Sequence, residues 1–329
     1  MKPLVLSDSP IPESMRDGFA NPALCLSYFH FTWGPPPSQD ELAAHLGPRT
    51  SSHDGIGVMH WSDWGSRWSR GEHCKHRDLS LADFCRHHET IELWFDVDPD
   101  AQLKLLWLLD YFHAHPETAD RLKLRLVDQD VSSIGLDGGR EWPPAVDVTA
   151  KELETAQAAW QAYRSPTPEA CVNLLQTDLS ALPLLKPVLL NLLSELPSAS
   201  TGLGASEMRM LEMIARGYSL TNALFYRESL RQTRVFNEFE YGYLLDGLAF
   251  GRKPAVSGLD EELRTMSREN LPERIKAYKR SRLSLTDFGR AVVAHREDFS
   301  RHNPIDRWWG GTHLTNDNLW RWSPALLKP

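Results

Sequence analysis

Residues 89–112 read ETIELWFDVDPDAQLKLLWLLDYF, and this stretch decides the fold. The mostly apolar run at 91–95 predicts a buried strand, and the longer apolar run that follows is typical of a buried helix. Between the two lie three carboxylates, Asp96, Asp98 and Asp100. In an open α/β sheet, ligands bind where the carboxyl end of a strand passes into a helix. This junction is therefore the first place to look for a functional site.

Short apolar runs alternate with helical patterns through residues 1–140, which predicts a mostly parallel sheet of Rossmann-like or flavodoxin-like type. The expected strands are LVL at 4–6, LCLSYFHF at 24–31, GIGVMHW at 55–61, IELWF at 91–95 and LKLRLV at 122–127. The expected crossover helices are SQDELAAHL at 38–46, SLADFCRHH at 80–88 and DAQLKLLWLLDYF at 100–112. No glycine-rich phosphate loop follows these strands in the sequence, so a standard dinucleotide or P-loop site is not expected.

The pattern changes to helices near the Pro143–Pro144 pair, which marks a domain boundary. Residues 141–200 are predicted to form a helical connector, with a capping box at Thr149 and Glu152. Residues 201–329 carry two helical patterns that end in glycine, then short extended segments and a final helix. This order predicts a winged-helix-like C-terminal domain, to which a Trp-rich terminal hairpin is added.

Length and composition bound the class of protein. At 329 residues the chain is long enough for two domains, and 41% hydrophobic residues is typical of folded globular proteins. No run of about 18 apolar residues could span a bilayer, and the N-terminus lacks the pattern of a signal peptide. We therefore expect a soluble, cytoplasmic protein with no membrane partner. The four cysteines lie far apart, which favours reduced thiols over a disulfide framework.

Charge is distributed unevenly. The net charge is −8: residues 1–150 hold 13 Lys+Arg against 23 Asp+Glu (net −10), and the rest hold 23 against 21 (net +2). Contact with nucleic acid is therefore expected only from the C-terminal part. The candidate residues there are Lys276, Lys279, Arg280 and Arg282. The expected recognition helix at 237–250 carries acids and no base, so nucleic acid is not the favoured partner.

Five segments carry a family resemblance. They are ELWFDVDPDAQLKLL at 92–106, SALPLLKPVLLNLLSELPS at 180–198, GLGASEMRMLEMIARG at 202–217, LSLTDFGRAVVAHRED at 283–298 and IDRWWGGTHLTNDNLWRW at 305–322. With them the chain resembles an uncharacterised bacterial family, domain of unknown function 1835, with its winged-helix-like C-terminal extension. At the acidic junction that family usually reads Glu-His-Asp, where this chain has Asp96, Val97 and Asp98, and it carries a further Asp where this chain has Ala101. The family has no assigned activity, so the resemblance implies kinship rather than function.

Polar residues follow three of the expected strands. Asp8 and Ser9 follow the first strand, Asp96 and Asp98 the fourth, and Asp128 the last. If these strand ends are neighbours, the five side chains line one ligand-binding crevice. Carboxylate oxygens suit Mg²⁺ or Mn²⁺, and Asp8 and Asp96 are the expected ligands, although the sequence requires no cofactor.

Some of these residues have a structural alternative. Asp98 precedes Pro99, which is the arrangement of a helix N-cap followed by proline at the first helical position. Asp96 lies ahead of that cap, so capping does not explain it. Ser9 has the position of a nucleophilic serine but needs a base, and helix capping is its alternative. The histidines considered as bases are His30, His60 and His113.

Two further clusters have a functional interpretation. Residues 73–88 contain His73, Cys74, His76, Cys85, His87 and His88, and zinc would accept four such ligands. Their spacing matches no familiar zinc motif, so a polar loop followed by a helix is the alternative. The terminal tryptophans, Trp308, Trp309, Trp320 and Trp322, could stack on bases. Packing of a hairpin against the preceding domain is the favoured interpretation for them.

The leading functional hypothesis is a regulatory or sensor protein whose α/β crevice binds a small, nucleotide-like ligand. The first alternative is a divalent-metal-dependent hydrolase or phosphotransferase that uses Asp8, Asp96 and Asp98. The second is a DNA-binding regulator that acts through the C-terminal module. Whether the protein is an enzyme is left open by the sequence, because a fold hosts many functions.

Overall fold

The computed structural model describes residues 3–10, 23–50, 57–63, 78–126, 144–226, 234–260, 265, 267 and 269–329. The chain divides into two compact units. The first comprises Met1–Phe31, Pro36–Arg164 and Asn173–Val188, and the second comprises Thr32–Pro35, Ser165–Val172 and Leu189–Pro329. The predicted connector at 141–200 has residues in both units.

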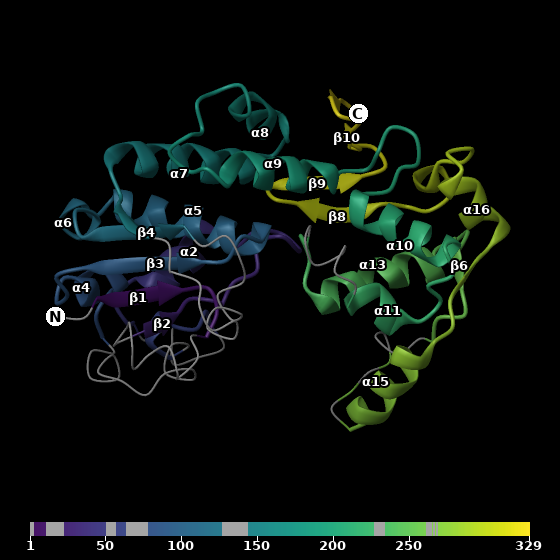
Figure 1. Cartoon of the computed structure of the whole chain (residues 1–329), viewed down its shortest axis with the longest axis horizontal. Coiled ribbons are helices and arrows are strands. Elements are labelled where there is room, and N and C mark those ends of the chain that lie inside the picture. Colours follow the sequence, from purple (N-terminus) through teal and green to yellow (C-terminus); the bar gives the residue numbers. More distant parts are fainter. Residues whose placement is uncertain are drawn as a thin grey trace. The chain divides into compact units, whose positions relative to one another are not determined.

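The first unit is built on a mixed, mostly parallel sheet of five strands (Figure 1). The strands are β1 (Leu4–Ser7), β2 (Ala23–Cys25), β3 (Ile91–Phe95), β4 (Leu122–Leu126) and β5 (Ala145–Asp147). They lie in the order β2-β1-β3-β4-β5, in which the first four are parallel and β5 is antiparallel to β4. The predicted α/β class is confirmed, as are the expected strands that became β1, β3 and β4.

Other strand predictions differ from the structure. The run at 24–31 pairs in the sheet only up to Cys25, and its remaining apolar residues pack through side chains: the rings of Phe29 and Phe31 meet Trp107 at 5.6 and 5.5 Å. The strand predicted at 55–61 is wrong, because the described residues 57–63 contain no strand. The apolar pattern there reflects burial of Trp61, whose Nε1 donates to the Leu79 carbonyl at 3.0 Å.

Four helices of the first unit lie where the sequence predicts them: α2 (Gln39–Leu46), α4 (Leu81–Cys85, shorter than the expected 80–88), α5 (Pro99–His113) and α7 (Ala150–Tyr163). The short helix α6 (Pro116–Ala119) was not predicted. Helix α7 begins at the predicted capping box, in which Thr149 and Glu152 exchange hydrogen bonds. It packs against α5, and Trp160 of α7 meets the ring of Phe31 at 4.8 Å.

Strand β3 and helix α5 form the centre of the first unit. All five residues of β3 are buried, as expected for a central strand covered on both faces. Helix α5 is buried from Pro99 to Leu109, including positions on every side of the helix. The junction between these two elements is therefore held on both sides by core packing.

The second unit contains short helices and three two-stranded antiparallel sheets. The helices are α8 (Glu169–Leu174), α9 (Leu185–Ser194, which begins in the first unit), α10 (Ala205–Ala215), α11 (Thr221–Tyr226), α13 (Glu238–Phe250), α15 (Leu271–Arg280), α16 (Asp287–Val293) and the 3₁₀ helix η4 (Phe299–Arg301). The strand pairs are β6 (Val256–Ser257) with β7 (Ser284–Leu285), β8 (Asp306–Trp309) with β9 (Thr312–Thr315), and β10 (Arg321–Trp322) with β11 (Leu326–Leu327).

The Trp-rich terminal hairpin is confirmed as β8 and β9. Gly310 turns the chain with φ 51°, a value that the first central residue of a type II′ turn requires. Trp309 is buried, and its Nε1 donates to the Leu192 carbonyl at 2.6 Å. Trp320 is buried as well. These two rings serve packing within the second unit and do not form a surface for stacking bases.

In the described part of the chain, no helix is long and apolar enough to cross a membrane. Cys25, Cys85 and Cys171 are free thiols, all buried. The reduced state expected from their spacing is confirmed for these three, and Cys74 lies outside the described residues.

We predict that Leu108→Ala, in the fully buried part of α5, lowers the free energy of unfolding by ~2–5 kcal/mol, because it removes apolar contact and leaves a cavity. Chemical denaturation followed by tryptophan fluorescence measures the change. Val146→Ala is the matched control: Val146 is 46% exposed on β5 of the same unit, so its loss should change the free energy by only ~0.5 kcal/mol. Equal losses in the two variants would contradict the central position of α5.

Candidate functional site

The sheet order brings two strand ends together. Strand β1 lies between β2 and β3. The chain passes from β1 to β2 on one side and then crosses to β3 on the other side, so the direction of strand addition switches between β1 and β3. Ser7 at the end of β1 is in register with Trp94, one residue before the end of β3. Ligands of open α/β sheets bind beyond the strand ends at such a switch. Asp8 and Asp96 are the residues that follow these two strands.

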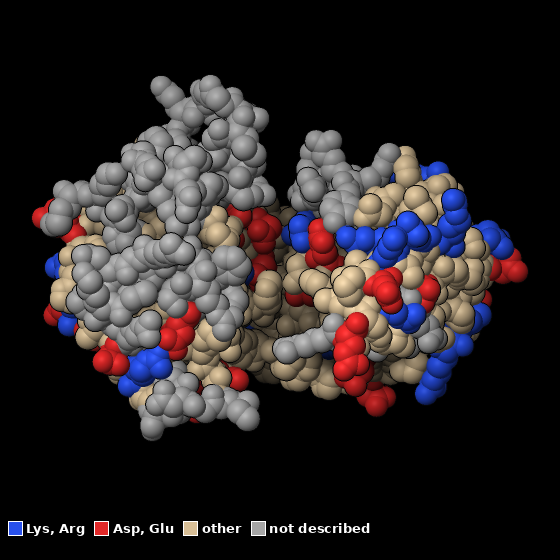
Figure 2. Space-filling model, turned by 90° about the horizontal axis from the view of Figure 1, so that it is seen from below, with Lys and Arg blue, Asp and Glu red and all other residues tan. Residues whose placement is uncertain are grey.

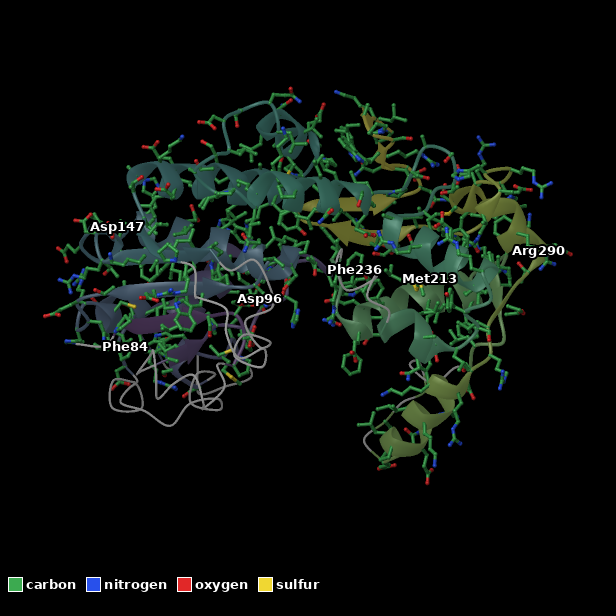
Figure 3. All side chains as sticks on the ribbon, in the orientation of Figure 1. Phe84, Asp96, Asp147, Met213, Phe236 and Arg290 are labelled. Carbon is green, nitrogen blue, oxygen red and sulfur yellow. The ribbon has the colours of Figure 1, made fainter. Side chains whose placement is uncertain are left out.

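Asp8, Asp96 and Asp98 form one carboxylate cluster. One oxygen from each lies within 4.8 Å of the other two, and no other group of three His, Cys, Asp or Glu in the described residues meets this criterion. Asp8 and Asp96 are 9% and 8% exposed, and Asp98 is half-buried. Figure 3 shows Asp96 just beyond the end of β3. The predicted convergence of these three carboxylates is therefore found in the structure.

Hydrogen bonds hold the cluster in place. The Asp96 backbone N–H donates to Asp8 Oδ1 at 3.1 Å, which joins the ends of β1 and β3. Ser9 Oγ lies 2.9 Å from Asp96 Oδ2 and 3.3 Å from Asp8 Oδ2, so its single proton can bond either carboxylate. Gln102 Nε2 donates to the Asp96 carbonyl at 2.7 Å and ties α5 to the same junction. Ser9 is thus part of the cluster, as expected.

Asp98 is the N-cap of α5. Its Oδ1 accepts from the backbone N–H groups of Asp100 and Ala101, both at 3.1 Å, and Pro99 occupies the first turn. The predicted capping role is confirmed. Both bonds use Oδ1, so Oδ2 stays able to face a ligand of the cluster. Capping and ligand binding are therefore compatible for this residue.

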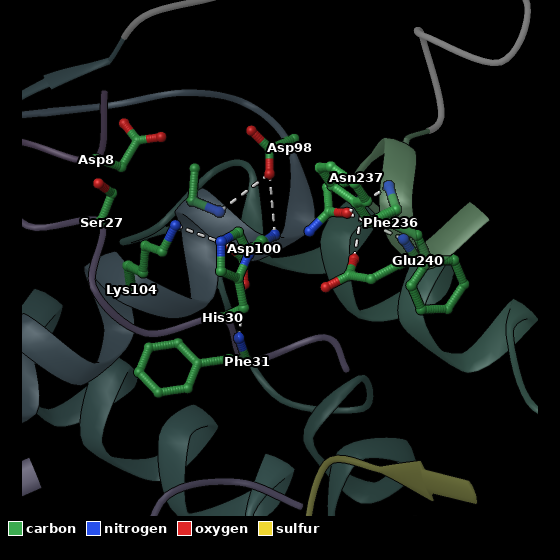
Figure 4. A network of polar contacts seen from close by, with 12 residues as sticks. Asp8, Ser27, His30, Phe31, Asp98, Asp100, Lys104, Phe236, Asn237 and Glu240 are labelled. Carbon is green, nitrogen blue, oxygen red and sulfur yellow. Dashed lines mark hydrogen bonds and ion pairs between the residues drawn. The ribbon is translucent and has the colours of Figure 1, made fainter. Parts of the chain in front are cut away.

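A buried ion pair lies beside the cluster (Figure 4). Lys104 Nζ on α5 lies 2.6 Å from Asp100 Oδ2, and His30 Nδ1 lies 3.4 Å from the same oxygen. The Phe31 backbone N–H donates to Asp100 Oδ1 at 2.7 Å. Burial alone would raise the pKa of Asp100, but Lys104 and His30 outweigh it and hold that pKa at about 2. Asp100 is therefore an ionised carboxylate that forms the counter-charge of the buried Lys104 ammonium.

In the carboxylate cluster, unlike at Asp100, the pKa values of two carboxyl groups are raised. Burial raises the pKa of Asp8 to about 8, and the neighbouring Asp96 and Asp98 carboxylates add to the rise while Lys104 opposes it. Burial also raises the pKa of Asp98, against the hydrogen bonds that it accepts as a cap. The positive charge of Lys104 is largely engaged by Asp100. The three carboxylates therefore repel one another at close range, and a bound proton or cation would relieve this repulsion.

The oxygen donors fit a hard divalent cation such as Mg²⁺ or Mn²⁺. Such ions take carboxylate oxygens, and three protein ligands leave open positions for water or a substrate oxygen. Asp8, Asp96 and Asp98 are the residues that would hold the ion. The raised pKa of Asp8 is in line with this fit, because burial and the neighbouring carboxylates hold a proton there that a cation would replace.

Lys104 and Gln102 were not predicted as site residues, and neither were the contacts of Asp100 with His30 and with Lys104. One sequence signal for them is Lys104 itself, a lysine inside the apolar run of α5, where it is 5% exposed. A buried lysine needs a carboxylate partner, and Asp100 stands four residues earlier on the same helix. That pairing could have been inferred from spacing, whereas the contact with His30 depends on the fold.

The histidines considered as bases for Ser9 include two that contact other residues. His30 contacts Asp100, and the ring nitrogens of His60 bond the Gly47 carbonyl and Ser62 Oγ at 2.9 and 2.8 Å. The Ser9 hydroxyl is paired with the Asp8 and Asp96 carboxylates instead. The remaining candidate for the crevice, Asp128, lies outside the described residues.

The zinc hypothesis for residues 73–88 gains no support in the part that the structure describes. His73, Cys74 and His76 lie outside the described residues. Cys85 is fully buried in α4, and burial raises the pKa of its thiol, which disfavours the thiolate that zinc binds. Among the described residues, Cys85, His87 and His88 do not form a group with metal-ligating spacing.

The nucleic-acid candidates belong to the second unit. Lys276, Lys279 and Arg280 lie on α15, and Arg282 follows that helix; all four are exposed. Helix α13, expected to act as the recognition helix, has Phe239 and Tyr243 exposed to solvent and buries Glu240 and Asp246. Its acids are thus partly internal, while the basic residues are on the surface.

Comparison with models of known protein families and with curated protein sequences gives no match for this chain.

We predict that Asp8 makes the stability of the cation-free protein depend on pH. The folded chain keeps a proton on Asp8 up to about pH 8, whereas the unfolded chain releases it near 3.8, so stability is lost as pH rises through this window. Asp8→Asn carries no such proton. Relative to this variant, the wild type should lose unfolding free energy as pH rises towards about 8 in buffer with a chelator.

The exposed Asp120→Asn variant in the same unit is the control, and its difference from wild type should not follow this curve. Other carboxylates with shifted pKa values, among them Asp98, Asp100 and Glu195, are present in both proteins, so their contributions largely cancel in the comparison. A wild-type minus Asp8→Asn difference that is constant with pH would contradict the raised pKa of Asp8.

Proposed function

We propose that the first unit binds a divalent cation, Mg²⁺ or Mn²⁺, at the carboxylate cluster and acts on a phosphate-bearing small molecule as a hydrolase or phosphotransferase. The observation that carries this proposal is the convergence of Asp8, Asp96 and Asp98 within 4.8 Å at the strand ends. Each residue alone has an ordinary structural role, but the three together concentrate negative charge that a cation would neutralise. This is the first alternative of the sequence hypotheses, and the geometry favours it over a site without metal.

The chemistry follows from the residues around the ion. A divalent cation held by three carboxylates would polarise a phosphoryl oxygen and offset charge on it. Ser9 and the acidic groups are close enough to bond a water or hydroxyl that attacks the phosphorus. Lys104 stays paired with Asp100 beside the cluster and keeps that carboxylate ionised. In hydrolysis, water forms the new P–O bond, and the old P–O bond to the leaving group breaks.

A sensor function is the second candidate, and one observation favours it. The second unit contains α10, α11 and α13 followed by the β6–β7 ribbon, an order that supports a winged-helix-like module of regulatory type. The first unit has the strand order of flavodoxin-like sheets with its last strand reversed. A nucleotide-like ligand bound without turnover would then be the signal. We propose membership of the domain-of-unknown-function 1835 family and a cytoplasmic location on the sequence features alone.

We predict that Mn²⁺ binds the wild-type protein in isothermal titration calorimetry. Asp8→Asn and Asp96→Asn should each weaken binding by more than about tenfold, because each removes a charged ligand. Asp98→Asn should also weaken it but keep the thermal midpoint, since asparagine caps a helix as well as aspartate. Asp120→Asn is again the control and should bind as the wild type does. Unchanged Mn²⁺ binding in Asp8→Asn and Asp96→Asn would rule out this ion site.

We further predict that the wild type releases inorganic phosphate from a mixture of nucleotides and sugar phosphates when Mn²⁺ is present. EDTA, Asp8→Asn and Asp96→Asn should each abolish the release. Thermal stabilisation by a nucleotide without phosphate release would favour the sensor function instead. Phosphate release that survives EDTA would contradict the metal-dependent proposal.

A further inference from the structure

Helix α15 and the segment just after its end carry four exposed cations, Lys276, Lys279, Arg280 and Arg282, which we call the α15 basic face. Within the described part of the chain, none of the four forms an ion pair. Other cations of the second unit do: Arg216, Lys253, Arg290 and Arg301 each lie within 3.9 Å of a carboxylate. Arg252 and Arg296 are exposed and, among the described residues, also form no ion pair, but they do not lie on this helix. The charge of the basic face is therefore directed to solvent, and Figure 2 shows Lys and Arg side chains gathered over part of this unit.

The opposite side of α15 anchors the helix to the second unit. Tyr278 is 5% exposed, and its carbonyl accepts from Thr221 Oγ1 on α11 at 2.7 Å. Just beyond the helix, the Leu283 N–H donates to the Ser219 carbonyl at 2.6 Å, and Arg282 forms a bridge with Leu220. The anchored side and the positions 276, 279 and 280 lie on different faces of the helix, as expected from spacings of three and four residues. The basic face is thus presented by a fixed element.

Helix stability explains only part of this arrangement. Lys279 and Arg280 lie in the last turn, where cations interact favourably with the helix dipole by ~0.3–1 kcal/mol each. Lys276 lies before that turn and Arg282 beyond the helix end. The dipole therefore does not account for all four exposed cations.

The chemistry of the face points to one class of partner. Insertion of a helix into an anionic membrane requires an apolar face free to enter the lipid, but Tyr278 on the apolar side of α15 is buried against its own unit. A nucleic-acid backbone needs only cations spaced along its phosphates. Residues 276 to 280 span ~6 Å of helix, which is the rise over about two phosphates of one strand.

We propose that the α15 basic face binds the phosphate backbone of duplex nucleic acid without reading its sequence. The face sits between β6 and β7 in the chain, beside a ribbon of the type that touches phosphate in winged-helix proteins. Sequence reading by α13 is not part of the proposal, because that helix exposes Phe239 and Tyr243 and has no basic residue. This function is separate from the carboxylate cluster and stands or falls independently of it.

Salt dependence gives the size of the expected effect. Each phosphate that a cation neutralises contributes about −0.9 to the slope of log affinity against log salt concentration. Four contacts predict a slope of about −3.6, which amounts to a fall of about a hundredfold between ~50 and ~200 mM salt. Glu273 on the same helix reduces the local potential and places the true slope below this limit.

The test measures fluorescence anisotropy of a labelled DNA duplex of arbitrary sequence with the full-length protein over this salt range. The wild type should bind, and a variant with Lys276, Lys279, Arg280 and Arg282 all changed to Gln should lose at least about tenfold in affinity and most of the slope. The matched control changes the paired cations Arg216, Lys253, Arg290 and Arg301 to Gln. It removes the same charge from the same unit and should keep most of the affinity.

A charge-keeping variant protects the test against misfolding: Lys276→Arg, Lys279→Arg, Arg280→Lys and Arg282→Lys together should retain binding. Polyglutamate and vesicles containing phosphatidylserine are offered as competing anions. The proposal is overturned if the wild type does not bind the duplex at ~50 mM salt, or if the two Gln variants lose affinity equally. Binding of polyglutamate or vesicles as tight as that of the duplex overturns it too.

Discussion

The burial of negative charge at the end of β3 is the constraint on which the rest of the site depends. Desolvation penalises a buried carboxylate unless a partner compensates it. Asp100 meets this requirement with Lys104, His30 and a backbone N–H, and Asp98 meets part of it as the cap of α5. Among the described residues no cation forms an ion pair with Asp8, and burial together with the neighbouring carboxylates raises its pKa to about 8. This raised pKa within a cluster of three carboxylates distinguishes a candidate ion site from an ordinary strand-to-helix corner.

The fold fixes this charge through its most buried elements. Strand β3 lies between β1 and β4, and helix α5, which begins three residues after Asp96, is buried on all sides from Pro99 to Leu109. Asp98 sets the start of α5, and Gln102 bonds back to the Asp96 carbonyl. The carboxylates therefore lie directly at the ends of rigid elements, which is how a metal or phosphate site is kept in a defined geometry.

Local sequence patterns were sufficient to predict the central strands and helices of the first unit and the convergence of its carboxylates. Strands β1, β3 and β4 and helices α5 and α7 follow from apolar runs and capping residues, and the carboxylates follow from their place after β1 and β3. The apolar pattern at 55–61 wrongly predicted a strand, because Trp61 is buried by side-chain packing rather than in a sheet. Strand β5 was not predicted, because its three residues are too few and too exposed to give an apolar pattern. The contact of His30 with Asp100 joins residues 70 positions apart, so no local pattern reveals it.

The central claim is that Asp8, Asp96 and Asp98 share one divalent cation. The most direct measurement is the anomalous diffraction of a crystal soaked in Mn²⁺. We predict a single anomalous peak ~2.0–2.6 Å from one oxygen of each carboxylate. A peak bound elsewhere with none at the cluster, or the three side chains turned away from one another around ordered water, would contradict the account.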